Sequence, residues 1–260
     1  MGRDPIEGAS SDFDCGRSTV SALEFDAHGF PKSSGIFETI KTVEGAPIAL
    51  GRHMRRALES ALALGISIPD EEFVRTEMVR VLSQNPHPFG RLRICFGQNL
   101  FHITHDAYAE QSEPATLNFY SQTVIGSIHK TFPYDDRFAL MKAAQDEGFH
   151  ESVLFNEKNE ITETATANLA LLISGEWATP PISAGILPGV VRAIAIEECA
   201  VKVRSIHISE IPEVESAFLL SSLRIAQPVS HIGDMKLKMG DASRDLEEQI
   251  RAHSQPVSVG

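Results

Sequence analysis

Apolar residues recur at two different spacings along this 260-residue chain, and the spacings predict its secondary structure. Over residues 52–64 apolar side chains return every three or four positions, which predicts an amphipathic helix. Its apolar face would consist of Met54, Ala57, Leu58, Ala61 and Leu62. A second helix is expected after Pro69, because its apolar residues keep the same spacing. They are Val74, Met78, Val81 and Leu82.

Shorter apolar runs between turn residues predict strands. In the first half of the chain, these are residues 18–25, 35–43, 91–97 and 100–105. In the second half, they are residues 152–156, 160–162, 168–174, 201–208 and 217–222. Further helices are expected at residues 135–147, from Pro188 onward, and near residues 244–252. Strands and helices in both halves indicate an α+β chain with two domains.

The domain boundaries follow from the polar stretches. Residues 1–18 are rich in Gly, Ser and Asp and read as a tail. We expect a smaller α+β domain over residues 19–114, a linker over 115–126 and a larger domain over 127–260.

Composition narrows the range of partners. A net charge of −12 argues against a nucleic-acid or anionic-membrane surface. The three cysteines are far apart, which argues against a disulfide framework and favours a reducing, cytoplasmic compartment. With no apolar run of membrane-spanning length, we expect no membrane anchor. His102 and His105 fall on opposite faces of a predicted strand, so we expect no metal site there.

Several residues could carry chemistry, although each has a more ordinary interpretation. Arg56, in a cluster of basic residues, could bind a phosphate or simply be solvated. Lys130, between apolar neighbours, could be a buried nucleophile, but most lysines lie on the surface. Glu163, just before a strand, could pair with a cationic ring nitrogen or form a surface ion pair.

Two backbone segments suit a phosphate as well. The helix that follows Pro188 would have free amides in its first turn, including those of Val190 and Val191. Ser222 ends an apolar strand at a turn and could add a hydroxyl group. An ordinary helix start and a serine-rich turn are the plain alternatives. Arg91 and Arg93 share one face of a strand and could bind substrate carboxylates or face solvent.

The order of these features matters more than any one of them. A lysine, then a glutamate 33 residues on, then "NLALLISGEWATPPISAGILPGVVR" resembles the fold-type IV pyridoxal-phosphate enzymes, the class IV aminotransferases and related lyases. The upstream "GIFETIKTVEGAPIALGRHMRRALESALALGI" and "RLRICFG" are also similar to segments of that family. The resemblance covers roughly residues 29–231, and it implies a two-domain fold like that of the D-amino-acid aminotransferases.

The resemblance implies roles for individual residues. Lys130 matches the lysine that binds pyridoxal 5′-phosphate covalently and shuttles protons, and Glu163 matches the acid that pairs with the ring nitrogen. The residues that match the phosphate-binding groups are Arg56, Val190, Val191 and Ser222. The family further implies a small amino substrate and a homodimer.

The chain departs from the family pattern in three places. Val191 stands where the family often has threonine, so a hydroxyl contact would be lost. The "TFPYDD" segment after Lys130 lacks the commoner asparagine. Arg224 occupies a position where small or apolar residues are usual, which could make it a substrate contact.

Thr39 favours one of the two activities found in this family, the lyase over the aminotransferase. Among similar enzymes, a threonine in this place is found in the 4-amino-4-deoxychorismate lyases, whereas the branched-chain aminotransferases usually have glycine. The chain is also short, as these lyases tend to be. We therefore expect such a lyase, with Thr39 assisting proton transfer and Arg91, Arg93 and Arg224 as candidates to hold substrate carboxylates. A class IV aminotransferase acting on branched-chain, D-amino or related substrates is the alternative, and a cofactor-binding protein without catalysis is a third, less favoured reading.

Overall fold

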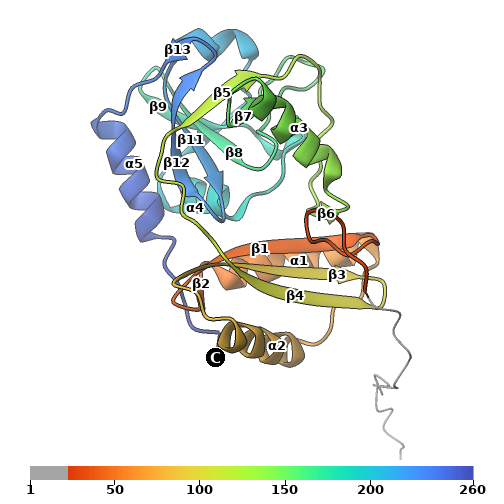
Figure 1. Ribbon diagram of the computed structural model, residues 1–260. Helices are drawn as coiled ribbons and strands as arrows, with labels where there is room; N and C mark the ends of the chain where they lie inside the picture. The colour runs from red at the N-terminus through yellow and green to blue at the C-terminus, as the bar shows by residue number, and fades with distance from the viewer. Residues whose placement is uncertain (1–22, 260) are drawn as a thin grey trace, which may run out of the picture.

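A smaller antiparallel sheet forms the lower part of the protein in Figure 1. The computed structural model describes residues 23–259. The sheet runs in the order β2-β1-β3-β4, and β6 pairs with the free edge of β1 near the start of that strand. Its strands are β1 (Gly35–Val43), β2 (Ala46–Pro47), β3 (Phe89–Gly97), β4 (Leu100–Ala107) and β6 (Thr131–Phe132).

Two helices, α1 (Leu50–Leu64) and α2 (Glu71–Gln84), cover one face of this sheet. The sheet contributes Ile36, Ile40, Leu92 and Ile94 to the core between them. The opposite face carries Phe37, Thr39 and Lys41, because side chains alternate along β1. That second face is turned toward the rest of the protein.

The face of α1 that is buried differs from the one that apolar spacing predicts. Ala57 and Ala61 are buried as expected, but Leu58 is 55% exposed and Leu62 is 86% exposed. His53 and Arg56 are buried in their place. Polar side chains can occupy the inner face because β1 offers them the carboxylate of Glu38. In α2, by contrast, all four predicted apolar residues are buried.

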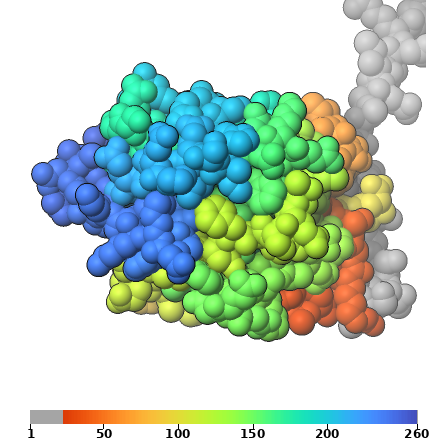
Figure 2. All heavy atoms as spheres, turned by 90° about the horizontal axis from the view of Figure 1, so that it is seen from above, coloured from red at the N-terminus to blue at the C-terminus, as the bar shows by residue number. Residues whose placement is uncertain are grey.

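A larger sheet of eight strands forms the upper part of the protein. Its order is β10-β9-β8-β11-β12-β5-β7, and β13 pairs with β12. These strands are β5 (Ala115–Phe119), β7 (Glu151–Val153), β8 (Asn168–Ile173), β9 (Glu176–Thr179), β10 (Lys202–Val203), β11 (Val214–Ser221), β12 (Ile225–Ile232) and β13 (Met235–Lys236). Segments far apart in sequence lie side by side, as β12 and β5 do. In the view from above, blue residues of the C-terminal part accordingly border yellow-green ones (Figure 2).

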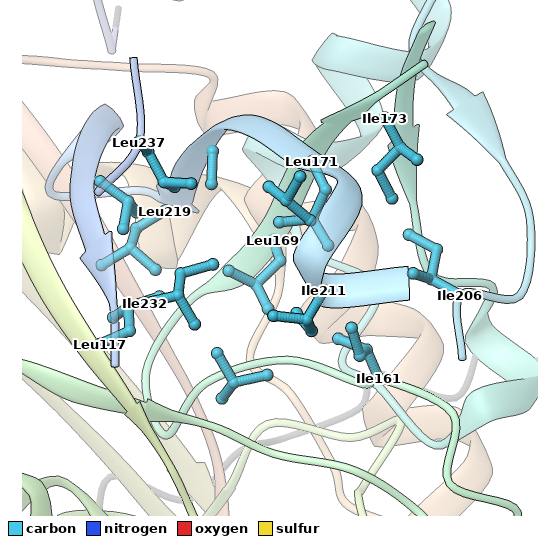
Figure 3. Close-up of a cluster of buried hydrophobic side chains, with 14 of the residues drawn as sticks. Leu117, Ile161, Leu169, Leu171, Ile173, Ile206, Ile211, Leu219, Ile232 and Leu237 are labelled. Carbon is cyan, nitrogen blue, oxygen red and sulfur yellow. The ribbon is translucent and has the colours of Figure 1, made fainter. Parts of the chain in front are cut away.

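Both faces of the larger sheet are buried. On one face, leucine and isoleucine side chains from β5, β8, β11 and β12 pack against residues outside the strands, as Figure 3 shows. These residues are Ile161, Ile206, Ile211 and Leu237. On the other face, α4 (Val190–Glu198) and α5 (Asp241–Ala252) pack against β11 and β12. The remaining helices are α3 (Asp135–Asp146) and the short 3-10 helices η1 (Ile182–Ala184) and η2 (Ile208–Glu213).

Several expected boundaries shift in the structure. Residues 115–126, expected to be a linker, begin with β5, a strand of the larger sheet. Of the expected strand 18–25, residues 18–22 lie outside the described part, and Phe25 forms only a single bridge. The expected strand 201–208 shortens to β10, because the carbonyl of Ile206 accepts a hydrogen bond from the amide of Ile161 instead. The expected strand 160–162 is likewise reduced to isolated bridges at Glu160 and Ile161.

The two parts of the fold are joined by more than one crossing. Lys130 and β6 follow the first strand of the larger sheet in sequence, yet β6 pairs with β1 of the smaller one. Near the other end of the chain, Val257 donates a backbone hydrogen bond to Pro47, and the carbonyl of Val259 accepts one from Arg75. These crossings fix the smaller sheet against the larger unit.

Candidate active site

A cavity of about 970 Å³ lies between the smaller sheet and the larger unit. Its wall includes all ten residues that the sequence singles out for cofactor or substrate binding and catalysis. They are Thr39, Arg56, Arg91, Arg93, Lys130, Glu163, Val190, Val191, Ser222 and Arg224. Their common location agrees with a single site, while the role of each stays a prediction.

Lys130 is held at the inner end of this cavity. Its carbonyl accepts a hydrogen bond from the amide of Phe37 at 2.8 Å, which joins the segment to β1. Its Nζ lies 4.5 Å from the ring centre of Phe37 and 5.0 Å from that of Tyr134. Burial, together with the nearby charge of Arg56, lowers the pKa of Lys130 to about 7. A large fraction of this amine is therefore unprotonated and nucleophilic at neutral pH.

The lowered pKa of Lys130 predicts how fast the apoprotein captures pyridoxal phosphate at different pH values. Only the free amine attacks an aldehyde, so the capture rate should rise with pH up to about 7 and then level off. Stopped-flow absorbance measures this rate directly. A midpoint near about 10, the range of an ordinary lysine, would contradict the buried environment.

Glu163 is a buried carboxylate with three partners. Its Oε1 lies 2.9 Å from the Arg137 guanidinium. Its Oε2 accepts hydrogen bonds from the Asn168 side chain at 3.1 Å and from the Leu187 amide at 3.0 Å. Burial raises the pKa of Glu163 in spite of the Arg137 charge. A further cationic group in the cavity would therefore be stabilised by this carboxylate.

Arg56 projects from α1 toward the start of α4. Its Nη1 donates a hydrogen bond to the carbonyl of Pro188 at 3.1 Å. The rest of the guanidinium forms a two-pronged contact with Glu38, from Nε to Oε1 at 2.8 Å and from Nη2 to Oε2 at 2.6 Å. Burial opposes ionisation of Glu38, but the charge of Arg56 and the hydrogen bond from His53 outweigh it and lower the Glu38 pKa to about 2. Arg56 is therefore fixed in orientation beside the helix end.

The first turn of α4 is open to the cavity. The helix begins at Val190, with Gly189 as its N-cap rather than Pro188 as its first residue. A Cβ atom on Gly189 would lie 1.9 Å from Oδ1 of Asn168, so a larger residue would have to displace this side chain, which bonds Glu163. The amides of Val190 and Val191 are among the first-turn donors that have no partner within a helix. Together with Arg56 and the hydroxyl of Ser222, they form a donor set suited to a phosphate.

Three further arginines line the cavity. Arg93 lies opposite Thr39 in the sheet, donates to the carbonyl of His28 at 2.7 Å, and stacks at 4.0 Å on the ring of Phe30. Arg91 contacts Asp106 at 3.1 Å.

The third arginine, Arg224, comes from the loop between β11 and β12. Its Nη2 lies 2.5 Å from Glu151 and 3.1 Å from the hydroxyl of Thr166. Within the described residues, one buried nitrogen of each of the three arginines has no hydrogen-bond partner. These are Nε of Arg91, Nε of Arg93 and Nη1 of Arg224. Unpaired buried N–H groups are costly. Elsewhere on their guanidinium groups, the three arginines line the cavity and could bind a carboxylate there.

The structure adds four residues to the site that the sequence did not single out. Arg137 pairs with Glu163, Tyr134 contacts Lys130, and Glu151 pairs with Arg224. Arg137 and Glu151 have no local signal, because their partners are distant in sequence. Tyr134 lies close to Lys130 in sequence, but nothing in the pattern marks its contact with that lysine. Glu38 did have a local signal, since it interrupts an inward-facing apolar series between Ile36 and Ile40.

Acid should destabilise the protein through Glu38. Its folded pKa of about 2 is below the ordinary 4.5, so ionised Glu38 stabilises the fold above pH 4.5. That contribution to the free energy of unfolding, about 3 kcal/mol, is lost as the pH falls from 4.5 toward 2. Glu38→Gln should remove this pH dependence. It should also lower stability at neutral pH by about 3 kcal/mol or more, because Arg56 stays buried without its counter-charge.

Urea denaturation at neutral and acidic pH measures both effects of the Glu38 substitution. Glu59→Gln, on the exposed face of the same helix as Arg56, is the matched control and should change little. If the free energy of unfolding depended on pH in the same way in both variants, the lowered pKa of Glu38 would be contradicted.

The donor set fits pyridoxal phosphate. Arg56, the first amides of α4 and Ser222 would hold the phosphate, Glu163 would face the ring nitrogen, and Lys130 would bind the aldehyde. Among residues 23–259, no group of three or more His, Cys, Asp or Glu side chains could hold a metal ion. In the same part of the chain, no helix has the length and apolar character needed to cross a membrane.

Comparison with solved structures confirms the predicted two-domain fold. A protein from Legionella pneumophila, proposed as a 4-amino-4-deoxychorismate lyase, matches with a TM-score of 0.76 and 21% identity, over 85% of this chain and 91% of that one. The branched-chain amino acid aminotransferase of Escherichia coli matches with a TM-score of 0.73 and 17% identity, over 85% of each chain. A hypothetical aminotransferase from Mycobacterium tuberculosis, in its PLP-bound form, matches with a TM-score of 0.74 and 15% identity, over 85% of this chain and 88% of that one.

The sequence itself matches one family profile over most of its length. The profile of the class IV aminotransferases covers residues 35–232. This range holds every residue of the candidate site, from Thr39 to Arg224. The chain therefore belongs to the class IV aminotransferase family, with pyridoxal phosphate as its cofactor.

Proposed function

We propose that the protein is a 4-amino-4-deoxychorismate lyase, which splits its substrate into pyruvate and 4-aminobenzoate. Each of these products carries one carboxylate, so the substrate carries two. The observation that carries the proposal is the presence of three arginines, Arg91, Arg93 and Arg224, in the wall of one cavity. A substrate with an apolar side chain and one carboxylate would leave at least one of these arginines without an anionic partner.

Bound pyridoxal phosphate supplies an electron sink for the carbon that bears the amino group. The amine of Lys130, with its lowered pKa, takes a proton from that carbon and can return one. Thr39 lies two residues beyond Phe37 on the same face of β1 and lines the same cavity as the lysine, and its hydroxyl helps to position the proton transfer. The ionised carboxylate of Glu163 would stabilise a positive charge on the ring nitrogen of the cofactor.

The arginines orient the substrate. Arg91 and Arg93 come from β3, and Arg224 comes from the larger unit. A substrate held between them has its carboxylates fixed at two places, which aligns the reacting carbon with Lys130. Loss of pyruvate then yields the aromatic product without an added oxidant or keto acid.

An aminotransferase is the second candidate. Lys130 and Glu163 would act in the same way, and dicarboxylic amino donors would suit the same arginines. The family contains both activities, and the likeness to an aminotransferase such as that of Escherichia coli supports this alternative on the level of fold. The homodimer implied by the resemblance remains part of the proposal in either case.

Product analysis separates the two activities. Holoprotein incubated with aminodeoxychorismate alone should release 4-aminobenzoate and pyruvate in equal amounts over many turnovers. A parallel reaction contains amino donors, first without and then with a keto acid. If the protein only exchanges amino groups, converting its cofactor until a keto acid is added, the lyase proposal is wrong and the aminotransferase stands.

Arg224 should control affinity for a dicarboxylic substrate. In Arg224→Gln, loss of a charge-assisted hydrogen bond of about 1.5–3 kcal/mol should raise KM by about 10- to 100-fold. The kcat value should change much less, because the contact exists in both the ground state and the transition state. Steady-state kinetics with the dicarboxylic substrate measure both values.

Two further variants make the result with Arg224 interpretable. Arg251→Gln removes an arginine that binds the carbonyl of Ala226, two residues from Arg224, outside the cavity wall. It should leave KM unchanged. Since Arg224→Gln leaves Glu151 buried without its partner, the double variant with Glu151→Gln separates a folding defect from a binding defect. An unchanged KM in a folded Arg224 variant would remove Arg224 from the binding site.

A further inference from the structure

A chain of buried polar contacts connects β1 to the proposed phosphate site. Nδ1 of His53 lies 2.6 Å from Oε2 of Glu38. On the other side of the same ring, Nε2 of His53 lies 3.2 Å from Oγ of Ser222. Glu38 and His53 are each only 1% exposed. The hydroxyl that would contact the phosphate is therefore linked through one imidazole to a buried carboxylate.

The direction of each hydrogen bond in this chain follows from the charges. The two-pronged contact with Arg56 keeps Glu38 ionised, so both of its oxygens only accept. Nδ1 of His53 must therefore carry a proton and donate it to Glu38. Burial lowers the pKa of His53, and Glu38 only partly offsets this, so the neutral ring has a lone pair on Nε2. Ser222 must then donate its hydroxyl proton to His53.

This arrangement conflicts with a bound phosphate. A hydroxyl that donates to His53 presents only lone pairs to the phosphate oxygens, which themselves can only accept when the group is a dianion. One proton on Nε2 resolves the conflict. Nε2 then donates to Oγ of Ser222, and the freed hydroxyl proton points to the phosphate. Each group in the chain has a matching partner in this second arrangement.

We propose that His53 is a positioning residue that takes up a proton when the cofactor phosphate binds and thereby converts Ser222 into a hydrogen-bond donor. The proposal rests on the phosphate-binding role of Ser222. It is independent of whether the enzyme is a lyase or an aminotransferase, because both would hold the same phosphate.

The charges around His53 make proton uptake depend on the ligand. Glu38 favours the protonated ring, whereas Arg56 and Lys130 oppose it, and burial adds to the opposition. Before the phosphate binds, burial and the charges of Arg56 and Lys130 prevail, so the pKa of His53 is lowered and the ring is neutral. A phosphate brings between about 1.5 and 2 negative charges to the far side of Ser222, which shifts the balance toward the imidazolium.

Calorimetry of apoprotein binding 4′-deoxypyridoxine 5′-phosphate tests this proton uptake. The analogue keeps the ring and phosphate but has no aldehyde, so Lys130 cannot react with it. Titrations in buffers of different ionisation enthalpy, at about pH 7.5, give the number of protons taken up per ligand bound. Wild-type protein should take up close to one proton more than His53→Gln. Its affinity should accordingly fall more steeply with rising pH, by up to about tenfold more per pH unit.

His150→Gln is the matched control, because His150 lies at the surface and contacts Thr116. It should behave as wild type. Equal proton uptake by wild-type protein and His53→Gln would overturn the proposal. No binding of the analogue by wild-type protein would overturn the phosphate site as well. The product assay above, which uses neither variant, decides the lyase function separately.

A second measurement covers the case in which His53→Gln fails to fold. Ser222→Ala removes only the hydroxyl that links His53 to the phosphate, and it should lose the extra proton uptake as well. Nitrogen-15 spectra of the histidine rings give a direct reading in wild-type protein. One buried ring should change from a proton on Nδ1 alone to protons on both nitrogens when the analogue binds. A buried ring that stays neutral in the complex would overturn the proposal.

Discussion

Lys130→Ala should give a folded protein that has lost the visible absorption band of bound pyridoxal phosphate and nearly all of its activity. The lysine is the one group that the site offers for both covalent attachment of the cofactor and proton transfer at the reacting carbon. General acid–base catalysis alone contributes about 10²- to 10⁴-fold, so turnover should fall by about 10⁴-fold or more. Absorbance spectra of the purified protein and single-turnover assays measure the two losses.

The fold should tolerate the loss of Lys130. The side chain lies against the rings of Phe37 and Tyr134 and forms no ion pair among the described contacts. Removing a buried amine therefore leaves no carboxylate without its partner. Lys142→Ala is the control, since this exposed lysine on α3 contacts only Asp146 at 2.6 Å and should keep both band and activity. A cofactor band of normal intensity in Lys130→Ala would place the attachment site elsewhere.

The two helices of the smaller part show what apolar spacing can and cannot predict. In α2, Val74 and Met78 are buried as expected, because they pack in one core cluster with apolar side chains of the sheet. In α1 the same reasoning placed Leu62 in the core, whereas it is 86% exposed. The inner face of α1 instead carries His53 and Arg56, whose burial depends on Glu38 in another element. A pattern read along one helix contains no information about such a distant partner.

The candidate site shows the same limit. Spacing along the chain was enough to propose Lys130 and Glu163, since both stand at fixed places in a block that resembles one family. The ion-pair partners of the site residues could not be predicted from spacing along the chain. Arg137, which opposes the raised pKa of Glu163, comes from α3, and Glu151, which holds Arg224, comes from β7. These pairs form only when the strands of the larger sheet assemble.

Arg56 and Arg224 are held in the cavity in the same way but have different proposed roles. Arg56 and Arg224 are held by the buried carboxylates Glu38 and Glu151, which fix each guanidinium in one orientation. Arg56 also contacts Pro188 at the start of α4, next to the proposed phosphate site. Arg224 instead lines the cavity from the loop between β11 and β12, where we propose that it binds a substrate carboxylate. Buried ion pairs contribute little net stability, so holding a donor in place is a better physical reason for them here.

Glu163→Gln is expected to reduce proton removal from the substrate by about 10²- to 10³-fold, comparable to the loss of one preorganised electrostatic partner. Glutamine can still accept hydrogen bonds from Asn168 and Leu187 through its amide oxygen. Its NH2 group would then face the Arg137 guanidinium, so Arg137 has to move away. The charge that would stabilise a protonated ring nitrogen is lost. A ring without that proton is a weaker electron sink, and the reacting carbon holds its proton more tightly.

Deuterium exchange at the carbon that bears the amino group measures proton removal directly in the Glu163 variant. The exchange requires neither pyruvate loss nor transfer to a keto acid, so it reports on Glu163 for a lyase and an aminotransferase alike. Glu160→Gln provides the control, because this nearby acid contacts Asn156 and does not line the cavity. Glu163→Asp keeps the charge on a shorter side chain and should recover part of the exchange rate. If Glu163→Gln exchanged deuterium as fast as Glu160→Gln, the carboxylate would serve only to hold Arg137, and another group would have to stabilise the ring nitrogen.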